Sequence, residues 1–154
     1  MYELNMDNYI KHSDTVVLGS IQDIRYYYDE DIPWTELIVK IDNVLYGQEQ
    51  EQIVSIFDMG GYLPVSHFEE YYGTVTGRDV DYVYMNFFQN VQYEIGNKGV
   101  FFLTLKERFG INGYDLVCSS YGALLCNNFE KYEYRREEIS ELIEMSDIEQ
   151  KIEK

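Results

Sequence analysis

Two long β-type segments near the N-terminus constrain the fold of this chain more than any other feature. Residues 15–28 read TVVLGSIQDIRYYY, a run rich in β-branched and aromatic side chains, and residues 34–46 alternate apolar and polar side chains. The linker DEDIP contains Pro33, which cannot donate to a strand ladder, and it predicts a hairpin connection. Gly19 lies inside the first segment, where glycine typically marks a bulge that lets one strand serve two sides of a barrel.

Further β-type segments follow and predict a small antiparallel barrel. In residues 34–46 we expect Leu37 and Val39 to face the core, and Glu36 to face solvent. The later strands are expected at residues 52–57, 100–107, 114–120 and 123–128. The barrel therefore has five to six strands.

Apolar residues at helical spacing predict a helix near each end of the chain. They recur at i, i+4, i+7 and i+8 from Tyr2, which predicts a short helix over residues 2–12. A drifting apolar stripe predicts a second helix over residues 135–152. The sequence SDIE at residues 146–149 resembles a capping box, so this helix can break and restart there.

Residues 60–97 interrupt the regular pattern with Pro64, several glycines and aromatic clusters. A structureless loop of that length is unusual in a compact domain, so we expect a short helix or a hairpin in it. No repeat or linker divides the chain. We predict a single domain over residues 1–154, in which residues 60–97 are an insertion within a barrel of residues 14–128.

The order of motifs resembles a known barrel family. SDTVVLGSI follows a short helix, the next strand ends in VLYG, a third runs into GG, and YEIGNKGVFFLTL, YDLV and SSYG follow. This series resembles the OB-like barrel domain, related to tissue-inhibitor-of-metalloproteinase and netrin modules, of uncharacterised Gram-positive bacterial proteins. The resemblance covers residues 2–127. It implies a mainly β, OB-like antiparallel β-barrel with a short N-terminal helix and a C-terminal helix.

The resemblance brings no catalytic residues. Metalloproteinase inhibition by the better-known relatives uses an N-terminal cysteine, whereas this chain begins Met1-Tyr2, so that mechanism does not transfer. Relatives of this kind are frequently exported or lipid-anchored. The chain is therefore expected in the cytoplasm if Met1 is the native start, and outside it, as a secreted protein or lipoprotein, if a leader was removed.

The charge balance restricts the partners. The chain has 28 acidic and 12 basic side chains, a formal net charge of −16. Nucleic-acid phosphates and anionic membrane surfaces repel such a chain, because binding to them depends on Lys and Arg. We expect no nucleic acid and no membrane insertion, since the longest apolar runs are too short to span a bilayer. A protein partner, with a basic protein as one candidate, fits the charge, although acidity also serves solubility alone.

Tyrosines supply the candidate binding surface. At least one side chain of the run Tyr26-Tyr27-Tyr28 must face outward, and acids stand beside tyrosines in the insertion. Tyrosine brings contact area and a hydrogen-bonding tip, while ordinary alternation of outward acids and inward tyrosines is the alternative explanation. The candidate binding residues are Tyr26, Tyr27, Tyr28, Tyr62, Phe68, Tyr71, Tyr72, Tyr82 and Tyr84.

No pattern predicts catalytic residues, a metal or a cofactor. His12 and His67 are the only histidines, and Ser66 beside His67 lacks any nucleophile motif. The three acids at residues 29–31 offer oxygen ligands for Ca²⁺, but they lack the alternation of a calcium loop, so a solvated turn is favoured.

Cys118 and Cys126 fit no zinc or redox spacing and lie on neighbouring predicted strands. Two half-buried free thiols are expected, with a disulfide between them as the alternative. Together these patterns favour a non-enzymatic binding or accessory module that acts through an acidic, Tyr-rich surface. The alternative is an acidic immunity or inhibitor protein that neutralises a basic protein partner.

Overall fold

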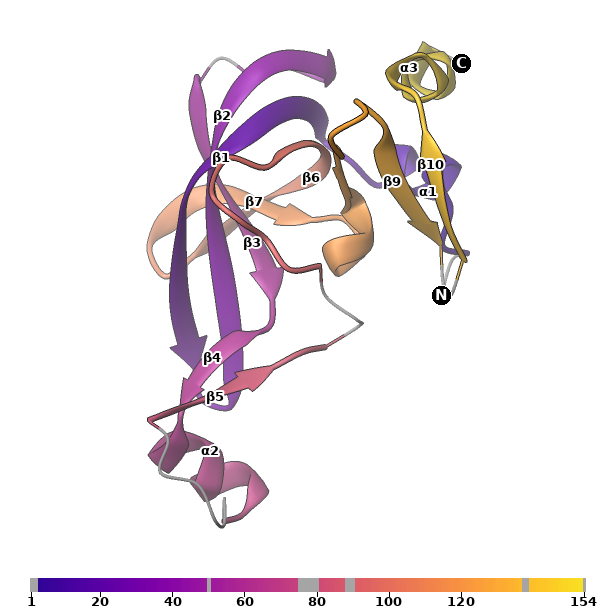
Figure 1. Cartoon of the computed structure of the whole chain (residues 1–154). Helices are drawn as coiled ribbons and strands as arrows, with labels where there is room; N and C mark the ends of the chain where they lie inside the picture. Colours follow the sequence, from indigo (N-terminus) through magenta and orange to yellow (C-terminus); the bar gives the residue numbers. More distant parts are fainter. Residues whose placement is uncertain (1–2, 50, 75–80, 88–90, 137–138, 154) are drawn as a thin grey trace.

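A closed ring of strands forms the body of the protein. The computed structural model describes residues 3–49, 51–74, 81–87, 91–136 and 139–153 (Figure 1). The main sheet has the strand order β1-β2-β3-β7-β6-β8, and β1 also pairs with β6, which closes the ring. These strands are β1 Thr15–Asp29, β2 Ile32–Tyr46, β3 Ile53–Met59, β6 Lys98–Arg108, β7 Ile111–Leu116 and β8 Ala123–Leu125. The predicted mainly β chain, with a barrel of five to six strands and a helix near each end, is confirmed.

β1 serves both sides of the ring. It pairs antiparallel with β2 over almost its whole length, and its first residues, 15–20, also pair antiparallel with β6. The β1–β2 register shifts between Leu18 and Gly19, where a bulge was predicted, and again between Ile21 and Asp23. Such bulges bend a strand and increase its twist, which allows β1 to turn from one neighbour to the other.

The ring closes on its other side through a short parallel contact. β3 and β7 pair in parallel at Ile56 with Tyr114 and at Phe57 with Asp115. Immediately before this contact, a Cβ atom on Gly113 would lie 2.4 Å from the carbonyl oxygen of Ser55. The two backbones can therefore approach as they do only because residue 113 has no side chain.

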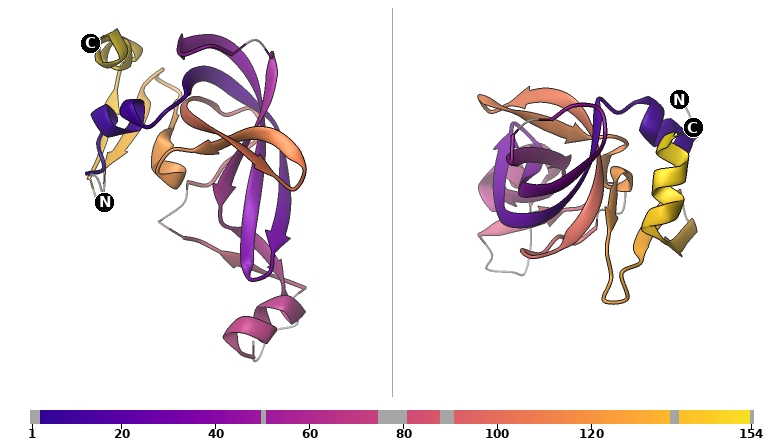
Figure 2. Two further views of the ribbon diagram at one scale, coloured as in Figure 1. Left: turned by 180° about the vertical axis from the view of Figure 1, so that it is seen from behind. Right: turned by 90° about the horizontal axis from the view of Figure 1, so that it is seen from above.

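Two apolar cores lie on the two faces of β6. The first fills the barrel and is built from Val17, Ile21, Leu37, Val39, Val54, Ile56, Phe101, Leu103, Tyr114, Leu116 and Ala123. The second lies outside it, beneath the terminal elements, and is built from Met6, Tyr9, Val16, Val100, Phe102, Val117, Leu124, Tyr132, Tyr134 and Ile148. Figure 2 shows the N-terminal and C-terminal segments of the chain together on one side of the barrel.

The predicted exposure of Glu36 is wrong. Glu36 is 1% exposed, although it lies on the face of β2 that points away from the barrel interior. Aromatic rings cover this part of the outer face: Tyr27 stacks on Phe109 with centroids 4.9 Å apart, and Phe109 also packs on Phe57, the β3 partner of Glu36. The Tyr27 hydroxyl donates to Glu36 Oε1 at 2.9 Å, which satisfies one oxygen of the buried carboxylate.

The N-terminal helix is shorter than the predicted residues 2–12. Helix α1 is Met6–Lys11, and it begins there because the Asn5 side chain accepts a hydrogen bond from the Asn8 backbone N–H at 2.9 Å. A polar side chain in this position satisfies a backbone donor that the first turn leaves free.

The predicted helix over residues 135–152 is wrong in its first half. That part forms a hairpin of β9 Tyr132–Arg136 and β10 Ile139–Ile143, and only α3 Met145–Glu153 is helical. The apolar stripe misled because its first part, Ile139 and Leu142, is exposed rather than packed on a core. The Glu144 N–H donates to Asp147 Oδ2 at 2.9 Å, so the capping interaction lies two residues before the predicted box at 146–149.

The insertion at residues 60–97 contains both of the elements that were offered as alternatives. β4 Gly61–Pro64 and β5 Tyr82–Met85 form an antiparallel hairpin, and α2 Val65–Tyr72 lies between them in sequence. In the described part of the chain, none of the helices is both long and apolar enough to cross a membrane.

We predict that Gly113→Ala destabilises the barrel by about 1–3 kcal/mol, since its methyl group would collide with the Ser55 carbonyl and force β3 and β7 apart. Urea unfolding followed by circular dichroism measures this change. Asn112→Ala, on the preceding residue of β7, is the matched control. Equal stability of the Gly113→Ala protein and the wild type would contradict the proposed role of this close approach.

Candidate functional site

The insertion projects from the end of the barrel at which the β1–β2 hairpin turns (Figure 1). It is fastened to β2 by two hydrogen bonds: the Gly60 N–H donates to the Pro33 carbonyl at 2.9 Å, and the Thr35 hydroxyl donates to the Gly60 carbonyl at 2.9 Å. We call the described residues 26–35, 60–74 and 81–87 the tyrosine lobe. It joins the β1–β2 hairpin end, β4, α2 and β5.

Three of the predicted binding residues meet in this lobe. Tyr62 of β4 lies directly opposite Tyr84 of β5, with ring centroids 5.1 Å apart and an interplanar angle of 63°. Tyr26 of β1 packs edge-to-face on Tyr62, at 4.9 Å and 88°. The three side chains remain 48%, 42% and 48% exposed for Tyr26, Tyr62 and Tyr84 respectively, so they form a row that solvent can reach.

These rings line a hollow of about 280 Å³, which we call the tyrosine pocket. Its other described lining residues are Ile24, Thr35, Asn86, Val91, Gln92 and Tyr93. Tyrosine is the only titratable residue type among them, and the remaining polar groups are a hydroxyl and two amides. The described wall of the pocket therefore offers aromatic surface and hydrogen-bonding groups without a charged side chain.

Asp58 anchors Tyr93, one of the residues that line the pocket. Its carboxylate is 2% exposed and accepts from the Tyr93 hydroxyl at 2.7 Å and from the Ser119 hydroxyl at 2.6 Å. Ser119 has a left-handed backbone (φ 54°), a costly conformation for a residue other than glycine. One carboxylate thus ties β3, the segment before β6 and the turn after β7 together.

Three phenols of the pocket, those of Tyr26, Tyr84 and Tyr93, have raised pKa values. The pKa of Tyr93 is raised well above its usual value, and burial of the phenol is the largest cause. The negative charge of Asp58 and the hydrogen bond that Tyr93 donates to it raise this pKa further. Burial also raises the pKa of Tyr26 and of Tyr84, with smaller contributions from Tyr62 to both and from Asp58 to Tyr84. At neutral pH the rings therefore act as dipolar and aromatic groups and carry no charge.

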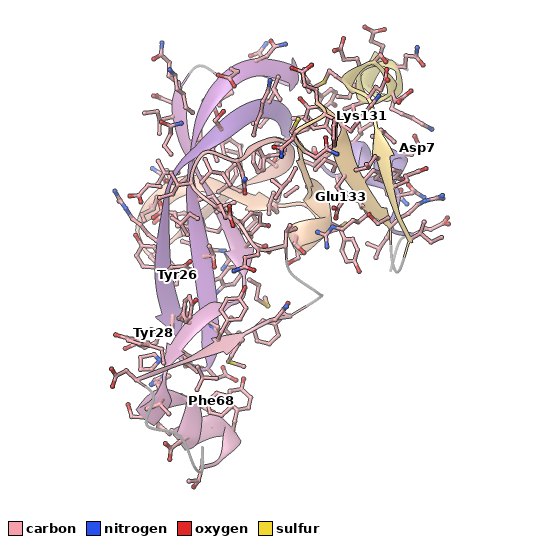
Figure 3. All side chains as sticks on the ribbon, in the orientation of Figure 1. Asp7, Tyr26, Tyr28, Phe68, Lys131 and Glu133 are labelled. Carbon is pink, nitrogen blue, oxygen red and sulfur yellow. The ribbon has the colours of Figure 1, made fainter. Side chains whose placement is uncertain are left out.

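The remaining candidates are not among the described residues that line the tyrosine pocket. Figure 3 shows Tyr28 and Phe68 in the lobe, beside the β1–β2 hairpin end and on α2. Tyr28 packs on His67, with centroids 5.0 Å apart, and His67 packs on Tyr71 at 5.3 Å. Tyr27 points to the opposite face of β1, because successive side chains of a strand alternate.

A hydrogen bond from Tyr72 fastens α2 to the hairpin end, and a ring contact within the helix supports that side chain. Phe68 stacks on Tyr72 with centroids 4.9 Å apart, and the Tyr72 hydroxyl donates to Asp31 Oδ2 at 3.0 Å. Tyr82 of β5 stands opposite Pro64 of β4. Its side chain is 61% exposed, the highest value among the nine candidates that the sequence nominated.

The tyrosine lobe carries charge of one sign. Its described residues include six carboxylates and no Lys or Arg. The carboxylates belong to Asp29, Glu30, Asp31, Glu69, Glu70 and Asp81. Over the described residues, His, Cys, Asp and Glu side chains form no group of three that could hold a metal ion. Cys118 and Cys126 are partly buried thiols that are not joined in a disulfide, as expected.

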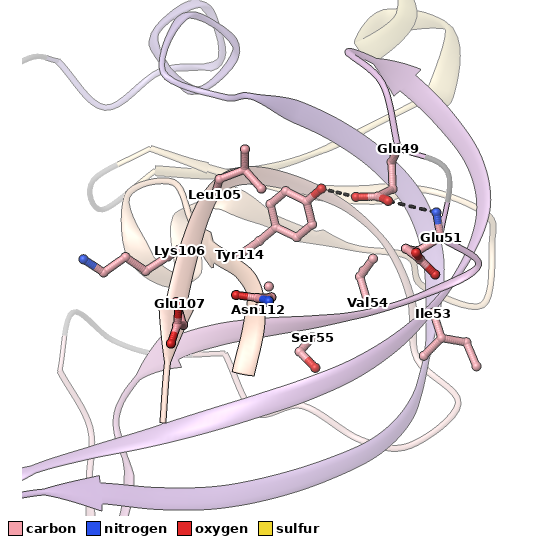
Figure 4. Close-up of a pocket in the computed structure, with 11 residues that line it drawn as sticks. Glu49, Glu51, Ile53, Val54, Ser55, Leu105, Lys106, Glu107, Asn112 and Tyr114 are labelled. Carbon is pink, nitrogen blue, oxygen red and sulfur yellow. Dashed lines mark hydrogen bonds between the residues drawn. The ribbon is translucent and has the colours of Figure 1, made fainter. Parts of the chain in front are cut away.

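A larger hollow has a volume of about 520 Å³ (Figure 4). It is lined by residues just before β3 and at its start, and by residues of the β6–β7 hairpin. Glu49, Glu51 and Glu107 line it together with Lys106. Tyr114 is the one aromatic residue among the described residues that line this hollow. Its hydroxyl donates a hydrogen bond to Glu49, which fixes the position of the ring. No sequence pattern pointed to this hollow, because the residues that line it come from three separate segments.

Comparisons with known proteins return no relatives: no family model matches the chain, and no curated protein matches it. The argument for function therefore depends on the site itself. Sequence reasoning nominated Tyr26, Tyr62 and Tyr84 but missed Asp58 and Tyr93. Asp58 falls at the end of an ordinary strand, and Tyr93 falls in a segment without periodicity, so neither carried a local signal.

We predict that the free energy of unfolding declines as pH rises above about 10, because unfolding lets Tyr93, whose pKa is raised in the folded state, release its proton. A raised folded-state pKa stabilises the native state below the unfolded pKa, and this contribution is lost at higher pH. Tyr93→Phe should therefore lose stability less steeply than the wild type, by about 1.4 kcal/mol per pH unit above pH 10. Urea unfolding across this range, with Tyr46→Phe as the control for loss of a phenol, checks the difference, and equal slopes for Tyr93→Phe and the wild type would refute it.

Proposed function

We propose that this chain is a non-enzymatic binding or accessory module that contacts a protein partner through the tyrosine lobe. The observation that carries the proposal is the convergence of Tyr26, Tyr62 and Tyr84, from three different strands, around one open pocket. A core would bury such rings, whereas here each is about half exposed. Tyrosine is also the residue type that binding surfaces favour, since it supplies contact area at low entropic cost.

The chemistry of the pocket supports binding rather than catalysis. Its described wall holds no pair of a nucleophile and a base, and its phenols with raised pKa values are poor proton acceptors at neutral pH. The barrel behind it acts as a rigid support for the lobe. The strand order and the parallel β3–β7 contact also support an OB-like barrel, the fold that the motif series resembles.

A second candidate function is the neutralisation of a basic protein, as an immunity or inhibitor protein would do. The six carboxylates of the lobe, unaccompanied by Lys or Arg in its described residues, favour this candidate. A field of one sign steers a basic partner toward the lobe and raises the association rate, an effect that salt screens.

We predict that a partner captured by the immobilised full chain is lost when the tyrosine row is removed. Tyr62→Ser combined with Tyr84→Ser should abolish capture, while Tyr46→Ser, equally exposed at the far end of β2, should retain it. Capture from lysate and envelope fractions is measured by mass spectrometry at low and at high salt. A basic partner released by salt supports neutralisation, and capture that survives the double substitution argues against the lobe.

A further inference from the structure

We propose that the tyrosine pocket receives an arginine side chain of the partner. This inference rests on the proposed function and names the group that the lobe recognises. The pocket is open to solvent at its Tyr26, Tyr62 and Tyr84 rim, so a side chain that projects from a partner surface can enter it. Its volume of about 280 Å³ accommodates a single side-chain head rather than a large ligand.

The pocket suits a cation. The face of a neutral tyrosine ring is electronegative and attracts a cationic group placed over it. No Lys or Arg is among the described residues that line the pocket, and the charge of Arg135, which acts on Tyr93, has a smaller effect there than that of Asp58. The buried carboxylate of Asp58 adds a negative potential close enough to influence Tyr84. The six carboxylates of the lobe extend this potential over the surrounding surface.

The pocket suits arginine better than lysine. A guanidinium is planar, stacks on aromatic rings and presents several N–H donors in its plane, whereas an ammonium is compact and strongly hydrated. The wall offers acceptors for such donors in the Thr35 hydroxyl oxygen, in the phenol oxygens and in the amide oxygen of Gln92.

The chain itself contains the same kind of contact. The guanidinium carbon of Arg108 lies 3.7 Å from the centroid of the Trp34 ring, and its nitrogens donate to both carboxylate oxygens of Asp115 at 2.7 Å. Arg135 similarly lies over the ring of Tyr121, at 5.1 Å. These contacts show that a guanidinium packs on aromatic rings of this fold while its N–H groups keep carboxylate or carbonyl partners.

The test uses the full chain and three synthetic peptides of equal length and spacing, which carry arginine, lysine or citrulline. Citrulline keeps the planar head of arginine but removes its charge. Isothermal titration calorimetry at low salt should show the arginine peptide binding at least about fivefold more tightly than the lysine peptide, and the citrulline peptide binding most weakly. Equal affinities for the arginine and lysine peptides would overturn the inference.

Substitutions locate the preference. Tyr62→Leu and Tyr84→Leu should reduce the arginine preference to within about twofold, because they remove the aromatic faces. Tyr62→Phe, which keeps the ring, and Tyr46→Leu, outside the lobe, should preserve it. Glu69→Gln with Glu70→Gln should weaken the arginine and lysine peptides alike, since those carboxylates act through long-range charge. A preference for arginine that survives Tyr62→Leu and Tyr84→Leu would place the site elsewhere and overturn the inference.

Failure of this inference and failure of the proposed function give different results. If the arginine and lysine peptides bind equally while Tyr62→Ser with Tyr84→Ser still abolishes partner capture, the lobe binds its partner without an arginine and only the inference is wrong. If no peptide binds and partner capture survives that double substitution, both are wrong. Circular dichroism of each variant confirms that a loss of binding does not come from unfolding.

Discussion

The pairing of one strand with two neighbours holds this fold together. β1 must hydrogen-bond to β2 and β6 at once, and it can do so only because bulges near Gly19 and Ile21 turn it across the barrel. The opposite closure, between β3 and β7, spans only a few residues and relies on the absence of a side chain at Gly113. The barrel interior, the second core and the position of the insertion all depend on these two closures.

Closure also determines where polar groups can be buried. At the end of the barrel that carries the tyrosine lobe, Asp58 points inward and would be costly to bury without partners. Tyr93 and Ser119 donate to it from two other segments, so the carboxylate fixes the edge on which the insertion stands. The open row of Tyr26, Tyr62 and Tyr84 lies on this edge, so the three rings stand on a fixed part of the barrel.

Local sequence patterns predicted the strands that bury a continuous apolar face. The alternation in β2 and the β-branched run in β1 anticipated those strands within a few residues, because each has a continuous apolar face on the barrel core. Prediction failed where the burial or exposure of a side chain depends on segments that are distant in the sequence. Glu36 is covered by aromatic rings from β1, β3 and the β6–β7 turn, and the stripe that begins at Ile139 belongs partly to an exposed hairpin rather than to a helix.

The sequence by itself determined that the chain is β-rich, acidic and well supplied with tyrosines, since composition and periodicity are local properties. It did not determine which tyrosines meet. Tyr26 and Tyr27 are neighbours in the chain, yet strand alternation sends one to the pocket and the other to Glu36. Tyr62 and Tyr84 join Tyr26 only because the β4–β5 hairpin folds back on β1. The tertiary structure decided the site, because its residues come from segments that only the closed barrel brings together.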